Sequence, residues 1–349
     1  MDTTAGLPLS WQKSRGSEMG ESSSEGTPAT LSLRDALAGN TSFSKDIVGL
    51  QLALDSTSLG AFKKCPRYYY YTILCGYEPK KLSHHLFFGL VYHGALERYD
   101  HGRSAGLPHD DCVDAAVKWL LEQTWSEATK RPWDSGDANK NRFTLLRTVV
   151  DYLDRFGEND SLETLQLDNG KPAVELSFTF FSGHHAGNGE PIHFCGHFDR
   201  VASMSGSDYI VDRKTTAGTI SPSWFAQFNP HNQFSLYALA GRVVFKFPVQ
   251  GVIVDGAQIA VGFSRFERAI SPRTDAQLEE WHADAIWTMQ EMERCARVGH
   301  WPMNDTSCDK YGGCAFRGIC SKPPGARQLW LDSEFTRRVW DPLQRRGDV

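Results

Sequence analysis

Three charged residues near the middle of the chain have the types and spacing that would hold a divalent cation beside a phosphate. Asp199 lies in one strand-like stretch, and Asp212 and Lys214 lie in a second, Ile210–Thr215. The turn-rich residues Met204–Ser207 between them predict a hairpin in which Asp199 lies opposite Asp212. Asp212 and Lys214 are two positions apart and share a strand face. Two carboxylates and an ammonium group at one end of a hairpin suit metal-assisted hydrolysis of a phosphodiester.

Two further pairs of polar residues fall on predicted helices. Gln233 and Tyr237 are one helical turn apart, and so are His93 and Glu97. The imidazole of His93 would suit Mn²⁺ better than Mg²⁺. The plainer alternatives are a structural helix histidine and a polar helix face with a half-buried tyrosine.

Taken together, these motifs resemble the RecB-like branch of the PD-(D/E)XK nuclease superfamily. Its Asp…(Asp/Glu)-x-Lys signature corresponds to Asp199, Asp212 and Lys214, and its Gly-x-x-x-His and Gln-x-x-x-Tyr motifs correspond to the two helix pairs. The resemblance runs from about Ser56 to Cys320. It implies a metal-dependent DNA exonuclease that uses Mg²⁺ or Mn²⁺, with single-stranded DNA ends as the expected substrate.

The resemblance also implies a role for each residue. Lys214 would orient the attacking water and offset charge in the transition state, and Gln233 and Tyr237 would contact phosphate or orient Lys214. Glu175, on the neighbouring predicted strand, would hold a second ion or position water, although a glutamate on a solvent-facing strand looks the same in sequence. The expected metal ligands are His93, Asp199, Asp212 and the backbone carbonyl of Arg213.

Four of the eight cysteines form a separate set. Cys65 precedes the predicted sheet, and the other three follow it at intervals of six residues: Cys308, Cys314 and Cys320. Zinc sites prefer shorter Cys-x₂₋₄-Cys spacing, whereas wide spacing is compatible with a [4Fe–4S] cluster. The set resembles the iron–sulfur branch of the family, which includes phage-type and CRISPR-associated exonucleases. Structural zinc is the alternative. The remaining cysteines are expected to be ordinary thiols: Cys75, Cys112, Cys195 and Cys295.

The hydrophobic pattern predicts an α/β protein with the order β-β-β-α-β-β, as in a mixed central sheet flanked by helices. An α-helical lobe is expected before the sheet and a cysteine cluster after it. The expected divisions are a disordered tail (1–46), an N-terminal helical region (47–160), the nuclease core (161–300), and the cysteine region with a C-terminal tail (301–349).

The net charge of −5 argues against a protein that coats nucleic acid generally, but a catalytic groove needs only a local positive strip. Candidates for such a strip include Arg265, Arg268 and Arg273. No long apolar run or secretory leader is apparent, so we expect no membrane partner and a bacterial or phage-infected host cytoplasm. DNA is the expected partner, with protein partners in a recombination or processing complex also considered. The rival interpretation is a non-catalytic DNA-binding or assembly subunit that retains the nuclease fold.

Overall fold

The computed structural model describes residues 33–80, 83–245, 247–310 and 313–344. Its helices are α1 (Leu33–Ala36), α2 (Ser56–Lys64), α3 (Pro66–Tyr69), α4 (His84–Ser104), α5 (His109–Gln123), α6 (Arg142–Phe156), α7 (Pro222–Ala226), α8 (Asn232–Val244), α9 (Asp275–Val298), α10 (Arg317–Cys320) and α11 (Arg327–Glu334). Its strands are β1 (Ala53–Leu54), β2 (Tyr77–Pro79), β3 (Trp125–Ser126), β4 (Arg131–Pro132), β5 (Glu163–Thr164), β6 (Val174–His185), β7 (Pro191–Met204), β8 (Ser207–Thr216), β9 (Val249–Ile259), β10 (Ser264–Pro272) and β11 (Phe335–Arg337).

A seven-stranded mixed sheet forms the centre of the fold and confirms the predicted α/β class. Its main order is β1-β7-β8-β9-β10, with β5 and β6 also paired to β7. Strands β8 and β9 are parallel, whereas β7 pairs antiparallel with both β6 and β8. The parallel step requires a crossover, which α7 and α8 supply. The sequence predicts a single helix between the third and fourth strands of the core, but the structure has two, α7 and α8. Pro230 falls between them and lacks the amide hydrogen that would continue one helix.

The β7–β8 hairpin has the predicted register with a tighter turn. Met204 pairs with Ser207 and Arg200 with Val211, so the loop is the two residues Ser205 and Gly206. Both have positive φ, which matches the twist of a two-residue hairpin. These pairs follow the predicted register as far as Arg200 and Val211, one residue short of the expected pairing of Asp199 with Asp212.

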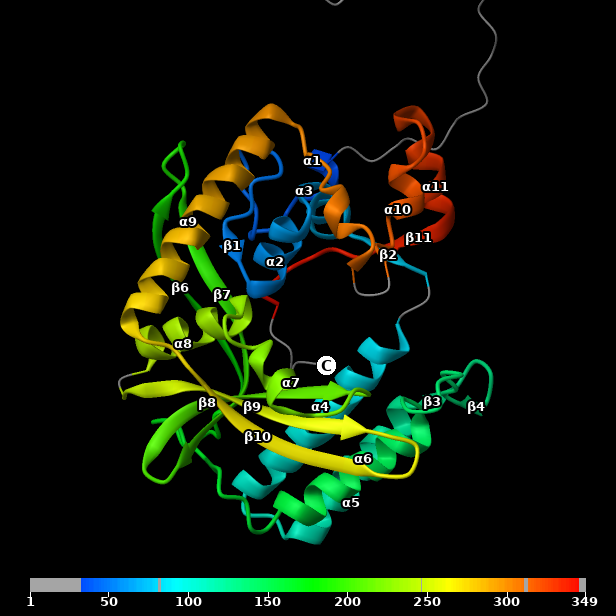
Figure 1. Ribbon diagram of the computed structural model, residues 1–349, viewed down its shortest axis with the longest axis vertical. Coiled ribbons are helices and arrows are strands. Elements are labelled where there is room, and N and C mark those ends of the chain that lie inside the picture. Colours follow the sequence, from blue (N-terminus) through cyan, green and yellow to red (C-terminus); the bar gives the residue numbers. More distant parts are fainter. Residues whose placement is uncertain (1–32, 81–82, 246, 311–312, 345–349) are drawn as a thin grey trace, which may run out of the picture. The chain divides into compact units, whose positions relative to one another are not determined.

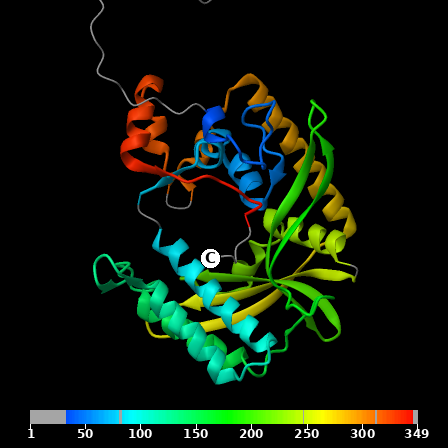
Figure 2. The same ribbon diagram turned by 180° about the vertical axis from the view of Figure 1, so that it is seen from behind.

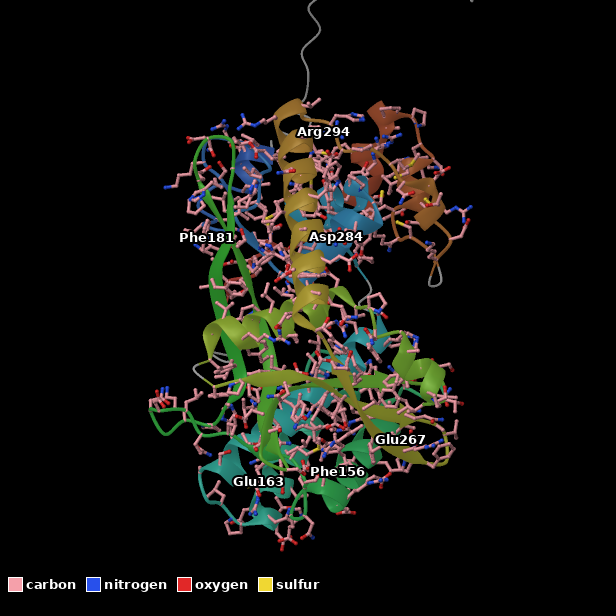
Figure 3. The ribbon with its side chains drawn as sticks, turned by 60° about the vertical axis from the view of Figure 1, so that its left-hand side comes forward. Phe156, Glu163, Phe181, Glu267, Asp284 and Arg294 are labelled. Carbon is pink, nitrogen blue, oxygen red and sulfur yellow. The ribbon has the colours of Figure 1, made fainter. Side chains whose placement is uncertain are left out.

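Two groups of helices cover opposite faces of the sheet (Figures 1 and 2). Strand β9 illustrates this arrangement, because its alternate side chains point to opposite faces of the sheet and pack into different cores. Val252 and Val254 belong to the core under α2, α8 and α9, whereas Ala257 and Ile259 belong to the core under α4, α5 and α6. Phe156, labelled in Figure 3, ends α6 beside β10, where Arg268 lies 3.9 Å from its ring.

The disordered tail predicted for residues 1–46 extends too far along the chain. Residues 1–32 lie outside the described residues, but 33–46 are folded. Ser42 is fully buried, Phe43 is 3% exposed, and Phe43 makes an antiparallel bridge to Gln51. Leu33 and Leu37 also pack against this core, so a few apolar side chains among polar residues hold the segment in place.

The expected C-terminal tail is also partly folded. Strand β11 pairs with β2, and Phe335 packs against Phe316 and Tyr77. Further along, Trp340 donates its indole hydrogen to Ser58 Oγ at 3.2 Å. Residues 335–340 thus pack back on β2 and α2, near the start of the described chain. Among the described residues, no helix has the length and apolarity needed to cross a membrane.

Candidate active site

Asp199 lies where β7 and β8 separate. The paired register between these strands runs from the turn as far as Arg200 and Val211. Beyond that point the backbone N–H of Arg213 donates to the Oδ2 atom of Asp199 at 2.9 Å. A side chain thus replaces the strand partner of Arg213 and directs a carboxylate into the gap between the strands.

Asp212 and Lys214 form an ion pair on β8. Lys214 Nζ lies 2.6 Å from Asp212 Oδ2, and the Asp212 side chain is only 1% exposed. Oδ2 is buried and has no well-directed hydrogen bond in the described structure, so the contact with Lys214 is mainly electrostatic. Burial, reinforced by the nearby Asp199 charge, outweighs Lys214 and raises the pKa of Asp212 to about 6.

Gln233 and Tyr237 hold Lys214 from helix α8. Lys214 donates to Gln233 Oε1 at 3.0 Å, and Gln233 Nε2 donates to the Tyr237 hydroxyl at 3.0 Å. That hydroxyl donates in turn to the backbone carbonyl of His197 at 2.6 Å. The one-turn spacing of the two helix residues therefore makes a continuous chain from β7 to the ammonium group.

His93 brings helix α4 into the site. Its Nδ1 lies 3.3 Å from Asp199 Oδ2. Burial opposes protonation of His93, but the Asp199 carboxylate outweighs it and raises the pKa of His93. Burial likewise opposes ionisation of Asp199, but His93, Lys214 and the Arg213 amide together hold the pKa of Asp199 well below its usual range. Asp199 is thus held in its anionic form by its neighbours, whereas burial favours the protonated form of Asp212.

The backbone and side chain of Arg213 serve different parts of the molecule. Its amide binds Asp199, whereas its guanidinium turns to the opposite face of the sheet and lies 2.6 Å from Asp100 Oδ2. Asp100 is on α4, seven residues after His93. The sequence analysis missed Asp100, although its place at i+7 from His93 puts both on one helix face.

Glu175 lies level with Asp199 on the next strand. Its neighbours Val174 and Leu176 pair with Arg200 and Phe198. Glu175 itself is half-buried and has a φ of +49°, a left-handed conformation that costs a non-glycine residue energy. Its proximity to the site agrees with the expected location, and its role in holding an ion or water stays a prediction.

The donors gathered here fit a hard divalent cation. Two carboxylates, one imidazole and a main-chain carbonyl are ligands that Mn²⁺ and Mg²⁺ accept. In the described structure the ligand atoms of His93, Asp199 and Asp212 do not all lie within 4.8 Å of one another, so a bound cation would draw them closer together. His93, Asp199, Asp212 and the carbonyl of Arg213 would be its ligands.

The four expected cluster cysteines come together although one is more than 240 positions from the rest. All of them line one pocket with Tyr68, Tyr71 and Phe316: Cys65, Cys308, Cys314 and Cys320. The backbone N–H of Asn304 donates to Cys65 Sγ at 3.2 Å. The tyrosines therefore shelter these thiols, and Tyr69 is fully buried in the core. The other four cysteines are buried or half-buried free thiols, as expected.

The distances between the cysteine sulfurs bear on the choice of metal. Within the described part of the chain, no three of them lie within 4.8 Å of one another. Four thiolates on one tetrahedral zinc would be only about 3.8 Å apart, given a Zn–S bond near 2.3 Å. The four sulfurs, as described, are therefore spread more widely than the ligands of one bound zinc ion, and the identity of any metal they hold stays a prediction.

The suggested basic strip is partly wrong. Arg273 is 5% exposed and donates to Ser235, Ser271 and the carbonyl of Phe228. The guanidinium of Arg268 is buried against Asp160 and Asp255. Both arginines satisfy buried partners of the fold, a use that sequence position alone does not distinguish from DNA contact.

Comparisons with known proteins agree with this geometry. The family model of the PD-(D/E)XK nuclease superfamily matches residues 56–321. No curated protein sequence matches the chain. Among solved structures, a protein from Eubacterium rectale whose name describes it as a candidate exonuclease is 13% identical, with a TM-score of 0.45 and coverage of 74% of this chain and 86% of its own. A second, SSO0001, is 11% identical, with a TM-score of 0.28 and coverage of 69% and 98%.

Proposed function

This chain belongs to the PD-(D/E)XK nuclease superfamily, and we propose that it is a metal-dependent deoxyribonuclease that degrades DNA from its ends. The observation that carries the proposal is the convergence of Asp199, Asp212 and Lys214, with His93 and Gln233 completing the set. These five side chains come from two strands, β7 and β8, and two helices, α4 and α8, yet all meet where β7 and β8 separate.

The residues have distinct tasks in the proposed reaction. Asp199, Asp212, His93 and the carbonyl of Arg213 hold Mg²⁺ or Mn²⁺, which when bound polarises the phosphate and acidifies water. Lys214, fixed by Gln233, places a positive charge where the transition state gains negative charge.

The preferred substrate in this proposal is single-stranded DNA with a free end. The reacting group is the backbone phosphate, so little sequence specificity is expected. Phage recombination, DNA-end processing and CRISPR-type spacer handling are reactions that need such an enzyme. A protein partner would supply any ATP-driven motor.

A non-catalytic DNA-binding subunit is the rival proposal. A fold kept only for binding has no need for the chain of contacts from the His197 carbonyl through Tyr237 and Gln233 to Lys214. That chain orients an ammonium group in a site with two carboxylates, which supports catalysis instead.

We also propose that Cys65, Cys308, Cys314 and Cys320 hold a [4Fe–4S] cluster. The shared pocket supports one common centre for the four cysteines, and their wide spacing in the sequence favours a cluster over zinc. The cluster would fasten the start of α3 to the segment after α9. Ordinary contacts already join these segments, because the Arg67 amide donates to the Pro302 carbonyl at 3.1 Å. The cluster would thus reinforce an existing closure.

The decisive experiment uses DNA labelled at either end, single- or double-stranded, with Mn²⁺, Mg²⁺ or a chelator. Metal-dependent release of short products from single strands is expected, and Asp212→Asn should abolish it. His93→Ala should raise the Mn²⁺ concentration needed for half-maximal rate. Cleavage by Asp212→Asn at the wild-type rate would overturn the assignment, and DNA binding without cleavage under every metal condition would favour the rival.

A further inference from the structure

The start of helix α4 carries a second cluster of metal-binding groups, away from the site described above. His84, His85 and Asp137 each offer one ligand atom, and these three atoms lie within 4.8 Å of one another. His84 Nε2 is 3.1 Å from Asp137 Oδ2. No other group of three histidine, cysteine, aspartate or glutamate side chains in the described chain comes this close.

The two imidazoles converge against the normal geometry of a helix. Consecutive helical residues project about 100° apart, so their side chains do not usually face each other. The rings of His84 and His85 nevertheless have centroids only 3.9 Å apart. An ion pair between His84 and Asp137 explains one imidazole beside the carboxylate, but it does not explain the second.

The carboxylate of Asp137 is held in place by its own loop. Its Oδ1 accepts the backbone N–H groups of Asn139 at 2.7 Å and Lys140 at 2.8 Å. These bonds leave Oδ2 directed at the imidazoles. Ligating carboxylates in proteins are typically oriented by such additional hydrogen bonds.

One neighbouring charge opposes a cation, but it is turned away. Lys140 is buried, and its Nζ lies 3.2 Å from Thr215 Oγ1 and 3.4 Å from the Thr215 carbonyl. It also lies over the ring of Phe88, 5.4 Å from the centroid. The ammonium group is thus engaged with β8 and α4, and it does not occupy the space between the histidines and Asp137.

We propose that His84, His85 and Asp137 bind a borderline divalent transition-metal ion such as Zn²⁺, which clamps helix α4 to the loop before α6. Two imidazoles and one carboxylate suit such an ion better than Mg²⁺, and the exposed side of His85 leaves a position for water. Asp137 and Lys140 belong to one loop, and Lys140 reaches Thr215, the neighbour of Lys214. The clamp therefore joins three segments that border the cleavage site: α4, the 134–141 loop and the end of β8.

Zn²⁺ titration by calorimetry tests the site in the full-length protein, isolated with its cysteine centre loaded and kept in excess Mg²⁺. Wild type should bind one Zn²⁺, and His84→Ala/His85→Ala, which removes two direct ligands, should lose more than the roughly 10–100-fold in affinity that loss of a supporting residue costs. His101→Ala is the matched control, since His101 is an exposed histidine on the same helix. Asp212→Asn should bind Zn²⁺ as wild type does, which separates this site from the cleavage site even if the proposed nuclease activity fails.

Two further measurements make the assignment specific. Co²⁺ bound at this site should show weak visible bands without strong thiolate charge-transfer absorption. Zn²⁺ should also slow amide hydrogen exchange in residues 134–141 of wild type but not of the double variant. Unchanged Zn²⁺ affinity in the double variant, thiolate absorption with Co²⁺, or exchange that Zn²⁺ leaves unaltered would overturn the proposal.

Discussion

The guanidinium of Arg213 lies 2.6 Å from the carboxylate of Asp100, and both side chains are less than a tenth exposed. This buried ion pair joins β8 to α4 directly behind the candidate site. Arg213 stands between Asp212 and Lys214, and Asp100 is on the helix that carries His93. The pair therefore sets the distance between the helix that supplies the imidazole and the strand that supplies the second carboxylate.

Asp100→Asn should destabilise the protein strongly, because it leaves the buried Arg213 charge unpaired. Loss of one partner of a buried pair costs about 3–5 kcal/mol. Urea unfolding of the variant measures this loss. Arg294→Ala is the control, since Arg294, whose side chain is 65% exposed, pairs with Glu291 on the surface of α9 and should contribute little to stability. Equal losses in the two variants would contradict the structural role of the Arg213–Asp100 pair.

Local patterns predicted several of the contacts that bring these candidate residues together. The hairpin register and the one-turn spacing of Gln233 and Tyr237 follow from repeats of two and 3.6 residues, which depend only on nearby sequence. Asp100 could not be found in this way, because its partner lies 113 positions away and only the folded chain brings them together. The same limit explains Arg273, whose buried acceptors include the carbonyl of Phe228. The prediction for Phe43 failed for a different reason. Its polar neighbours indicated a disordered tail, although Phe43 itself belongs to the core.

Asp212→Asn should stabilise the metal-free protein near pH 7–8 while removing metal-dependent cleavage. The folded-state pKa of Asp212, about 6, lies above its ordinary value of 3.8 because of burial. Stability from the protonated form is complete below the unfolded-state pKa and is lost as the pH rises through about 6. Asparagine mimics the uncharged form and should keep that stability.

Thermal unfolding in chelator, at intervals from pH 4 to 8, measures the effect. The melting temperature of Asp212→Asn should exceed that of wild type above pH 6, and the difference should shrink toward pH 4. Added Mn²⁺ should stabilise wild type more than the variant, since ligand bound only to the folded state raises its stability. A stability advantage that grows as the pH falls would show the opposite sign and exclude this account.

Lys214 and Gln233 should act as one unit in catalysis. Lys214→Ala should lower kcat by about 10²-fold or more, in the range seen when one charge-stabilising donor is lost. Gln233→Ala should lower kcat less, since it only releases the hydrogen bond that orients the ammonium group. The double variant should be little slower than Lys214→Ala alone, because the second change then has nothing to orient. Multiplying effects would instead show that Gln233 acts independently of Lys214.

Cys65 and Cys314 should be equally necessary for a coloured centre, although they are 249 positions apart. Both line the same pocket, so each would ligate the same cluster. Protein purified without oxygen should absorb broadly near about 400 nm, as thiolate-bound iron–sulfur clusters do. Either Cys65→Ala or Cys314→Ala should remove this absorption and lower the melting temperature, because cluster assembly is coupled to folding.

Cys75→Ala is the matched control for the cysteine centre. Cys75 follows the four tyrosines Tyr68–Tyr71 and packs near the same aromatic residues as the cluster cysteines. It does not line the pocket that those cysteines share. Burial raises the pKa of the Cys75 thiol to about 11, which disfavours the thiolate that a metal requires. Its replacement should leave the colour unchanged, and iron analysis should give about four irons per chain for wild type. Colourless protein with one zinc per chain would replace the cluster by a zinc site. Colour that persists in Cys65→Ala would show that the early helix contributes no ligand.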